Sequence, residues 1–94
     1  MTSEIRCATK FLGNDMIQQF NHMSSELNEI MEEIWGCEEY SEERTAMEVI
    51  DLQSSCQTFL EGSMGLTKDK IAKYRKMVIA KNAARGYYKE DDTP

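Results

Sequence analysis

Long stretches of this sequence contain neither proline nor glycine, and this feature constrains the fold more than any other. The single proline is residue 94, and the five glycines gather at a few points along the chain. Because these two residues interrupt helices, the stretches between them are suited to helix. The sequence shows no period-two alternation of apolar and polar residues and no hairpin turn dipeptide between apolar segments, which argues against strands. An all-α fold is therefore predicted.

Capping residues divide the chain into three predicted helices. The first follows a cap at Asn14 or Asp15 and ends near residue 35, where Gly36 can stop it. The second follows Ser41 and ends near residue 61, and the third follows Thr67 and ends near residue 85. Each helix carries one apolar stripe at helical spacing. The stripes are Phe20, Met23, Leu27, Ile30, Met31 and Ile34; Val49, Leu52, Cys56, Phe59 and Leu60; and Ile71, Tyr74, Met77 and Val78.

Three stripes of this kind make a thin core for a single domain of 94 residues. We therefore expect an antiparallel helical hairpin plus a C-terminal helix, in which a four-helix-bundle core is completed by oligomerisation. A homodimer or a tetramer would supply the missing helices. Residues 1–13 and 89–94 are expected to be loosely ordered.

The net charge and the cysteines limit which partners and which cellular locations are expected. The chain has 17 acidic and 11 basic residues, a net charge of −6, which argues against a nucleic-acid polymer or a membrane surface as partner. No apolar run approaches the ~20 residues that span a bilayer, and no signal peptide is recognisable, so a soluble cytoplasmic protein is expected. Cys7, Cys37 and Cys56 are odd in number and lack C-x-x-C spacing, which favours reduced thiols.

Two carboxylate pairs with the same spacing border the apolar stripes. Glu26 and Glu29 lie on the first helix, and Glu48 and Asp51 on the second. In an antiparallel hairpin that turns between residues 38 and 39, Glu29 lies opposite Glu48, and Glu26 lies opposite Asp51. With helix axes about 8–10 Å apart, opposed carboxylates repel unless a proton or a cation lies between them. Oxygen-only ligands of this kind suit Mg²⁺, with Mn²⁺ as a substitute.

The alternative for these acids is ordinary solvated surface, because Glu-x-x-Glu alone is a weak signal. His22, the single histidine, weakens any His-based metal site or triad. It lies one turn before Glu26 on the same strip, where it either touches substrate or has a partly exposed capping role.

Three segments of the sequence resemble a known family. "SELNEIMEEI" at 25–34 and "EVIDL" at 48–52 resemble the E-E-x-x-E…E-x-x-D signature of MazG-like, all-α nucleoside triphosphate pyrophosphatases. "KNAARGYY" at 81–88 resembles the K-N-x-x-R-G-Y/W close of short, often phage-encoded members, whose location would be the host cytoplasm. The resemblance covers about residues 18–88. It implies Mg²⁺-dependent cleavage of a nucleoside triphosphate between the α and β phosphates, with Glu26, Glu29, Glu48 and Asp51 as metal-binding and catalytic residues.

Ser25 departs from the family pattern, because it stands where the first glutamate of the E-E pair is usual. Glu33, one turn beyond Glu29, is a candidate to compensate. The expected substrate-binding residues are Lys81, Asn82, Arg85, Tyr88, His22 and Trp35.

The substrate-binding residues are assigned from what a nucleoside triphosphate requires of its site. Lys81 and Arg85 would meet the phosphate charge, Asn82 would bind a phosphate or the sugar, and the aromatic rings would stack on a base. The alternatives are that cations favour helix C-termini and that Trp35 belongs to a core or a dimer interface.

The first functional hypothesis is an oligomeric Mg²⁺-dependent (deoxy)nucleoside triphosphate pyrophosphohydrolase. Its site would lie between the hairpin and a C-terminal segment of the same or a neighbouring chain, and a purine nucleotide such as dGTP is one candidate substrate. The second is a non-catalytic acidic helical protein that binds and inhibits a host enzyme.

Overall fold

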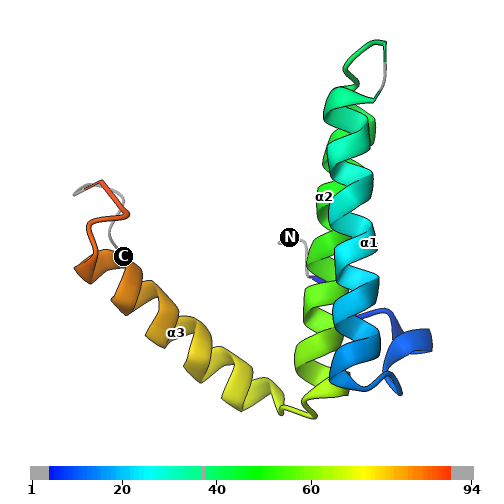
Figure 1. Cartoon of the computed structure of the whole chain (residues 1–94). Helices are drawn as coiled ribbons and strands as arrows, with labels where there is room; N and C mark the ends of the chain where they lie inside the picture. Colours follow the sequence, from blue (N-terminus) through cyan, green and yellow to red (C-terminus); the bar gives the residue numbers. More distant parts are fainter. Residues whose placement is uncertain (1–4, 37, 90–94) are drawn as a thin grey trace.

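The computed structural model describes residues 5–36 and 38–89, and the regular structure within these ranges is helical. Helices α1 (Met16–Trp35) and α2 (Glu42–Thr58) lie side by side and antiparallel, and α3 (Lys68–Ala84) leaves the base of this hairpin at an angle (Figure 1). A short turn of 3₁₀ helix, η1 (Thr9–Phe11), precedes α1, and a π-helical turn, η2 (Phe59–Ser63), follows α2. The predicted all-α fold is confirmed.

Side-chain caps begin the three α-helices at the predicted positions. Asp15 Oδ1 accepts a hydrogen bond from the Gln18 backbone N–H at 2.8 Å, and Gln18 Oε1 accepts one from the Asp15 N–H at 3.0 Å. Ser41 and Thr67 each accept from the backbone N–H three residues further on, both at 3.2 Å. These bonds satisfy amides that have no partner within the helix. Local sequence therefore sets where each helix begins.

The end of α2 differs from the prediction. The α-helix ends at Thr58 and continues as η2 to residue 63, instead of ending near residue 61. A Cβ atom at Gly62 would lie 2.6 Å from the carbonyl oxygen of Leu12. The missing side chain at Gly62 is therefore what allows this turn to lie so close to the segment before α1.

The N-terminal segment is attached to the C-terminal part of α2. The Ala8 N–H donates to Thr58 Oγ1 at 2.7 Å, and Ser54 Oγ donates to the carbonyl oxygen of Arg6. Of the segments expected to be loosely ordered, residues 1–4 and 90–94 lie outside the described ranges. Ile5, Arg6, Cys7 and Thr9 of this segment line one wall of the junction between α2 and α3.

Two further expectations concern thiols and membranes. Cys7 and Cys56 are free thiols, and Cys37 lies outside the described residues. Within the part of the chain that the structure describes, no helix combines the length and the apolar character needed to cross a membrane.

The enclosed side chains of the described residues are mostly polar, and much of the apolar surface faces outward. Gln19 and Thr58 are 0% exposed, whereas Phe20 and Leu27 are each 58% exposed. Ile71 is the one hydrophobic residue of the described ranges classed as buried. The prediction that the apolar stripes face a core is thus wrong for the single chain at many positions. The exposed members are Phe20, Leu27, Met31, Ile34, Val49, Tyr74, Met77 and Val78.

The reason is geometric, because α1 and α2 share one contact line and α3 turns away from it (Figure 1). The Cα radius of gyration is 15.6 Å, compared with about 12 Å for a compact chain of this length. The single chain is open, and completion of its core by a second copy stays a prediction.

We expect Gly62→Ala to lower the free energy of unfolding by about 1–3 kcal/mol, because the new methyl group would press against the backbone of Leu12. Gly13→Ala is the matched control, since a Cβ at Gly13 meets nothing within 4 Å. Urea unfolding of both variants measures the difference. Equal midpoints for the two variants would contradict the close approach.

Candidate functional site

Polar side chains line the contact between α1 and α2, in the register that the sequence predicts. Glu33 Oε2 lies 3.1 Å from Arg44 Nε, and these residues are equally distant from the predicted turn. Near the base of the hairpin, Gln19 Nε2 donates to the carbonyl oxygen of Ser55 at 3.0 Å. We call this row the polar seam. It comprises Gln19, His22, Glu26, Glu29 and Glu33 of α1 with Arg44, Glu48, Asp51, Ser55 and Thr58 of α2.

Glu26 is the most enclosed acid of the polar seam, with 8% of the residue exposed. Ser55 Oγ donates to Glu26 Oε1, and His22 Nε2 lies 3.2 Å from the same oxygen. Burial raises the pKa of Glu26; His22 opposes this rise, and the charges of Asp51 and Glu29 add to it. Glu26 is therefore an acid whose protonated form is favoured more than in water.

Glu29 and Glu48 interact directly across the seam. Their hydrogen bond is the largest cause that raises the pKa of Glu48, followed by burial and by the charges of Glu29, Asp51 and Glu33. Two carboxyl groups can form such a bond only when one of them holds a proton. Within the described ranges, the enclosed oxygen Oε2 of Glu48 has no hydrogen-bond partner. A hydrogen-bond donor or a cation beside this oxygen would therefore stabilise the pair.

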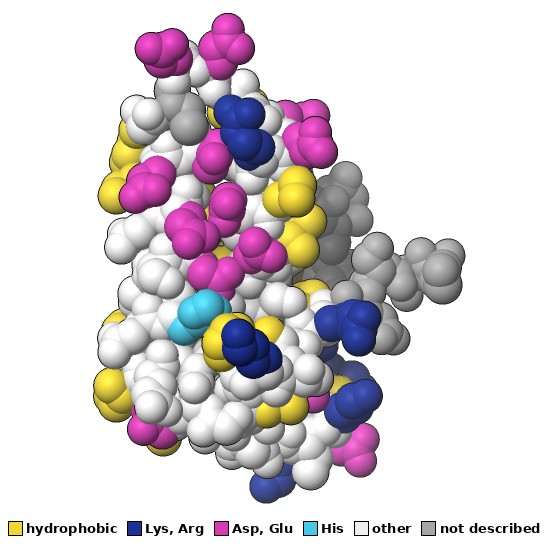
Figure 2. All heavy atoms as spheres, turned by 90° about the vertical axis from the view of Figure 1, so that its right-hand side faces the viewer, with side chains coloured by type: hydrophobic (Ala, Val, Ile, Leu, Met, Phe, Trp, Pro, Cys, Tyr) yellow, Lys and Arg dark blue, Asp and Glu magenta, His cyan; other side chains and the backbone are white. Residues whose placement is uncertain are grey.

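The four predicted acids lie on neighbouring turns of the hairpin. Figure 2 shows acidic side chains gathered on one face, with the histidine at the edge of the group. Among residues 5–36 and 38–89, however, no three His, Cys, Asp or Glu side chains are placed so that they could hold a metal ion. The acids are instead arranged as a carboxyl pair, Glu29 with Glu48, beside a Glu26 that is turned toward His22 and Ser55.

Ser25, which departs from the family pattern, and Glu33, the candidate to compensate for it, each interact with a nearby residue. Ser25 Oγ donates to the carbonyl oxygen of His22 at 2.8 Å, within its own helix, and Ser25 is exposed. Glu33 is paired with Arg44. Glu33 could compensate for the missing glutamate only by exchanging Arg44 for a metal ion.

His22 lies beside Glu26, as predicted from their spacing. Its ring centroid is 4.7 Å from that of Phe11, which comes from η1. His22 stands well inside α1 and so does not cap this helix. We call Glu26, Glu29, Glu48 and Asp51 the acidic patch. The position of His22 at the end of this patch keeps it available for contact with a bound molecule.

The other expected substrate residues are not brought to the acids within one chain. The C-terminal end of α3 lies far from the hairpin in Figure 1. Trp35 is 77% exposed at the opposite end of the hairpin from η2. The Arg85 guanidinium lies 5.8 Å from the ring centre of Tyr87. Four expected substrate residues lie on α3 or just after it and are therefore separated from the acids. They are Lys81, Asn82, Arg85 and Tyr88.

Sequence reasoning missed Ser55 and Gln19, which organise the base of the polar seam. Ser55 follows Asp51 by four residues, so it lies one turn further along the same side of α2. The turn symmetry that pairs Glu26 with Asp51 also places Ser55 opposite His22. The spacing could therefore have identified Ser55.

We expect the stability of the metal-free protein to fall as the pH rises above about 4.5, the ordinary pKa of a glutamate. The folded state raises the pKa of Glu26 and Glu48, so their contribution to stability is complete below the unfolded pKa and is lost as the pH rises through the folded one. Glu48→Gln should therefore melt at a higher temperature than the native chain at pH 7, and the gap should close toward pH 4.5. Thermal unfolding in EDTA measures this, with Glu32→Gln, an exposed acid of α1, as control. A gap of the same size for the control would attribute the effect to net charge alone.

Comparison with family models, with curated proteins and with solved structures finds no match to this chain.

Proposed function

We propose that this protein is a Mg²⁺-dependent nucleoside triphosphate pyrophosphohydrolase that yields a nucleoside monophosphate and pyrophosphate. The observation that carries the proposal is the Glu29–Glu48 carboxyl pair with the unpartnered oxygen Oε2 of Glu48. The pair costs folding free energy at neutral pH unless a proton or a cation compensates it. Such a cost is common at sites that bind metal and substrate.

The residues fit a hard dication in kind, although no three of the described acids are placed to hold one in their present rotamers. Carboxylate oxygens are the ligands that Mg²⁺ prefers, and Glu29, Glu48 and Asp51 supply them from two facing helices. Side-chain rotations would be needed, since the present rotamers form the carboxyl pair. When bound, Mg²⁺ neutralises phosphate charge and lowers the pKa of a water ligand.

Glu26 is the best candidate for the proton acceptor. Its raised pKa brings it closer to neutrality than an ordinary glutamate, which suits a general base. Ser55 and His22 both contact Oε1 and so hold the carboxylate in place, with Oε2 the remaining oxygen for a water molecule. His22 can also stabilise the charge that Glu26 carries before it accepts the proton.

A second copy of the chain would complete the site. Helix α3 carries six lysines and arginines and one acid, whereas α1 and α2 together carry eight acids and one arginine. This separation of charge, together with the exposed apolar residues Tyr74, Met77 and Val78 of α3, favours docking of α3 on the hairpin of a neighbouring chain. Lys81 and Arg85 would then reach the phosphates bound at the neighbour's acids.

The direct test is incubation with each common dNTP and NTP in the presence of Mg²⁺, followed by separation of the products. We expect monophosphate and pyrophosphate, with dGTP among the nucleotides screened. Glu48→Gln should lower turnover by about 100-fold or more with unchanged helix content. Release of orthophosphate would reject the reaction type. Loss of helix content in the variant would make Glu48 architectural.

Mg²⁺ should raise the melting temperature of the native chain, because it binds only the folded state. Glu48→Gln should lose this response, and Glu32→Gln should keep it. Without a Mg²⁺ effect and without product from any nucleotide, the alternative of an acidic inhibitor would be favoured. That alternative needs its acids on an exposed face, and Glu29 and Asp51 are exposed whereas Glu26 is buried.

The shared site can be tested by mixing two inactive variants, Glu48→Gln and Arg85→Gln. If the acids of one chain work with the cations of its partner, each mixed dimer has one intact site and one doubly altered site. Refolding an equal mixture should then restore about a quarter of the native activity. No recovery from a mixture shown to contain mixed dimers would mean that each chain completes its own site.

A further inference from the structure

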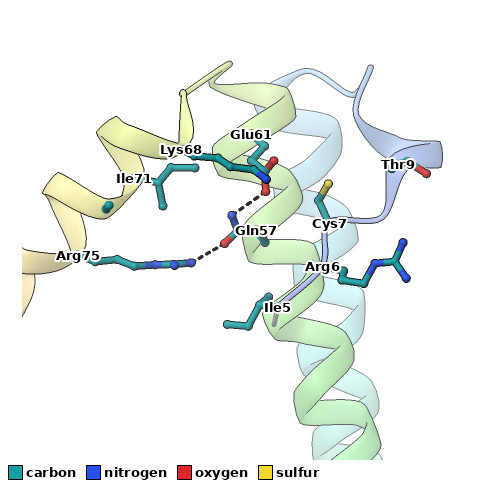
Figure 3. Close-up of a pocket in the computed structure, with 10 residues that line it drawn as sticks. Ile5, Arg6, Cys7, Thr9, Gln57, Glu61, Lys68, Ile71 and Arg75 are labelled. Carbon is teal, nitrogen blue, oxygen red and sulfur yellow. Dashed lines mark hydrogen bonds between the residues drawn. The ribbon is translucent and has the colours of Figure 1, made fainter. Parts of the chain in front are cut away.

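A pocket lies at the junction between the N-terminal segment, the end of α2 and the start of α3, and none of the four predicted acids lines it (Figure 3). Its volume is about 570 Å³, within the range of small-molecule sites. We call it the junction pocket. Its lining includes Ile5, Gln57, Lys68, Ile71, Ala72 and Arg75.

The charge of the junction pocket is opposite to that of the whole chain. Arg6, Lys68 and Arg75 line it together with a single acid, Glu61, although the protein has a net charge of −6. Figure 3 shows Lys68 and Arg75 reaching from α3 toward α2, while the guanidinium of Arg6 points away from Arg75. Two cations of α3, two helical turns apart, therefore face the cavity.

Within residues 5–36 and 38–89, a neutral amide holds Arg75 in place and no carboxylate is in direct contact with it. Its Nη2 donates to Gln57 Oε1 at 2.6 Å, and Gln57 Nε2 donates to Glu61 Oε2 at 2.7 Å. Gln57 is buried, so this chain of two hydrogen bonds fixes the guanidinium from one side. The neutral amide orients Arg75 but leaves its charge uncompensated at short range, and its remaining N–H groups can receive an anion.

Part of the remaining wall is apolar. Ile71 is 4% exposed, and Ile5 and Ala72 line the same cavity. A ligand that matches this lining has a doubly charged head for the two cations and an uncharged body for the isoleucines.

We propose that the junction pocket binds a small phosphomonoester, with the phosphate between Arg75 and Lys68 and the body of the molecule against Ile5 and Ile71. A phosphomonoester carries about two negative charges near pH 7 and three acceptor oxygens, which matches the paired cations. The pocket touches both α2 and α3, so an occupant would add contacts between the hairpin and α3. This site does not depend on the function proposed for the acidic patch.

The test is calorimetric titration with adenosine monophosphate in EDTA, so that the metal-dependent site is not loaded. Adenosine is the matched ligand without the charge, and inorganic phosphate is the head without the body. Saturable binding of the monophosphate at millimolar concentration or below is expected, with weaker binding of phosphate and none of adenosine. Arg75→Gln and Lys68→Gln should each weaken binding by about tenfold or more.

The matched control is Lys76→Gln, which removes the same charge from an exposed position of α3 that does not line the pocket. Ala72→Phe fills the cavity at unchanged charge and should also abolish binding, with helix content checked by circular dichroism. Four results would overturn the proposal. They are no binding, equal binding of adenosine, equal loss in Lys76→Gln, and retained affinity in all three pocket variants. Loss of binding in Glu48→Gln, with Arg75→Gln unaffected, would assign the monophosphate to the acidic patch instead.

Discussion

The structure depends on the polar contact between α1 and α2. Most helical hairpins bury apolar side chains along such a line, whereas this one encloses Gln19, Glu26, Ser55 and Thr58. Each of these has a partner: Gln19 and Ser55 bond across the helices, and Thr58 also receives the N-terminal segment. Because buried polar groups are costly without partners, a slip of one helix along the other would leave several of them unsatisfied. The polar seam therefore specifies the register, and the register determines which acids face each other.

A polar interior has a consequence for the outside of the hairpin. Apolar residues of α1 and α2 that are not buried between the two helices are exposed. The apolar residues of α3 that follow Ile71 are exposed too. An exposed apolar surface of this extent is unusual for a monomer and is typical of an interface. The same arrangement that concentrates carboxylates on one face thus favours assembly through the others, and the basic α3 is the element whose charge complements the hairpin.

The predictions that the structure confirms depend on local chemistry and on the hairpin symmetry. The caps at Asp15, Ser41 and Thr67 begin helices as predicted, and the Glu33–Arg44 ion pair confirms a turn placed from flanking residues alone. Periodicity could not give the direction of α3, because an amphipathic stripe shows that a face needs cover without showing which chain covers it. Periodicity also missed the π turn, where Gly62 lies close to Leu12, fifty residues earlier in the chain.

The link between the hairpin and α3 is narrow, and this bears on how the parts can act together. Beyond the connecting turn, the described contacts that hold α3 centre on Ile71 and on the hydrogen bond from Arg75 to Gln57. A helix held at one end by so few contacts changes its angle at low cost, since little buried surface is lost. Lys81 and Arg85 lie at its free end, where a small rotation at the junction produces a large displacement. Whatever stabilises the Gln57–Arg75 contact therefore also restricts where the distal cations of α3 can reach.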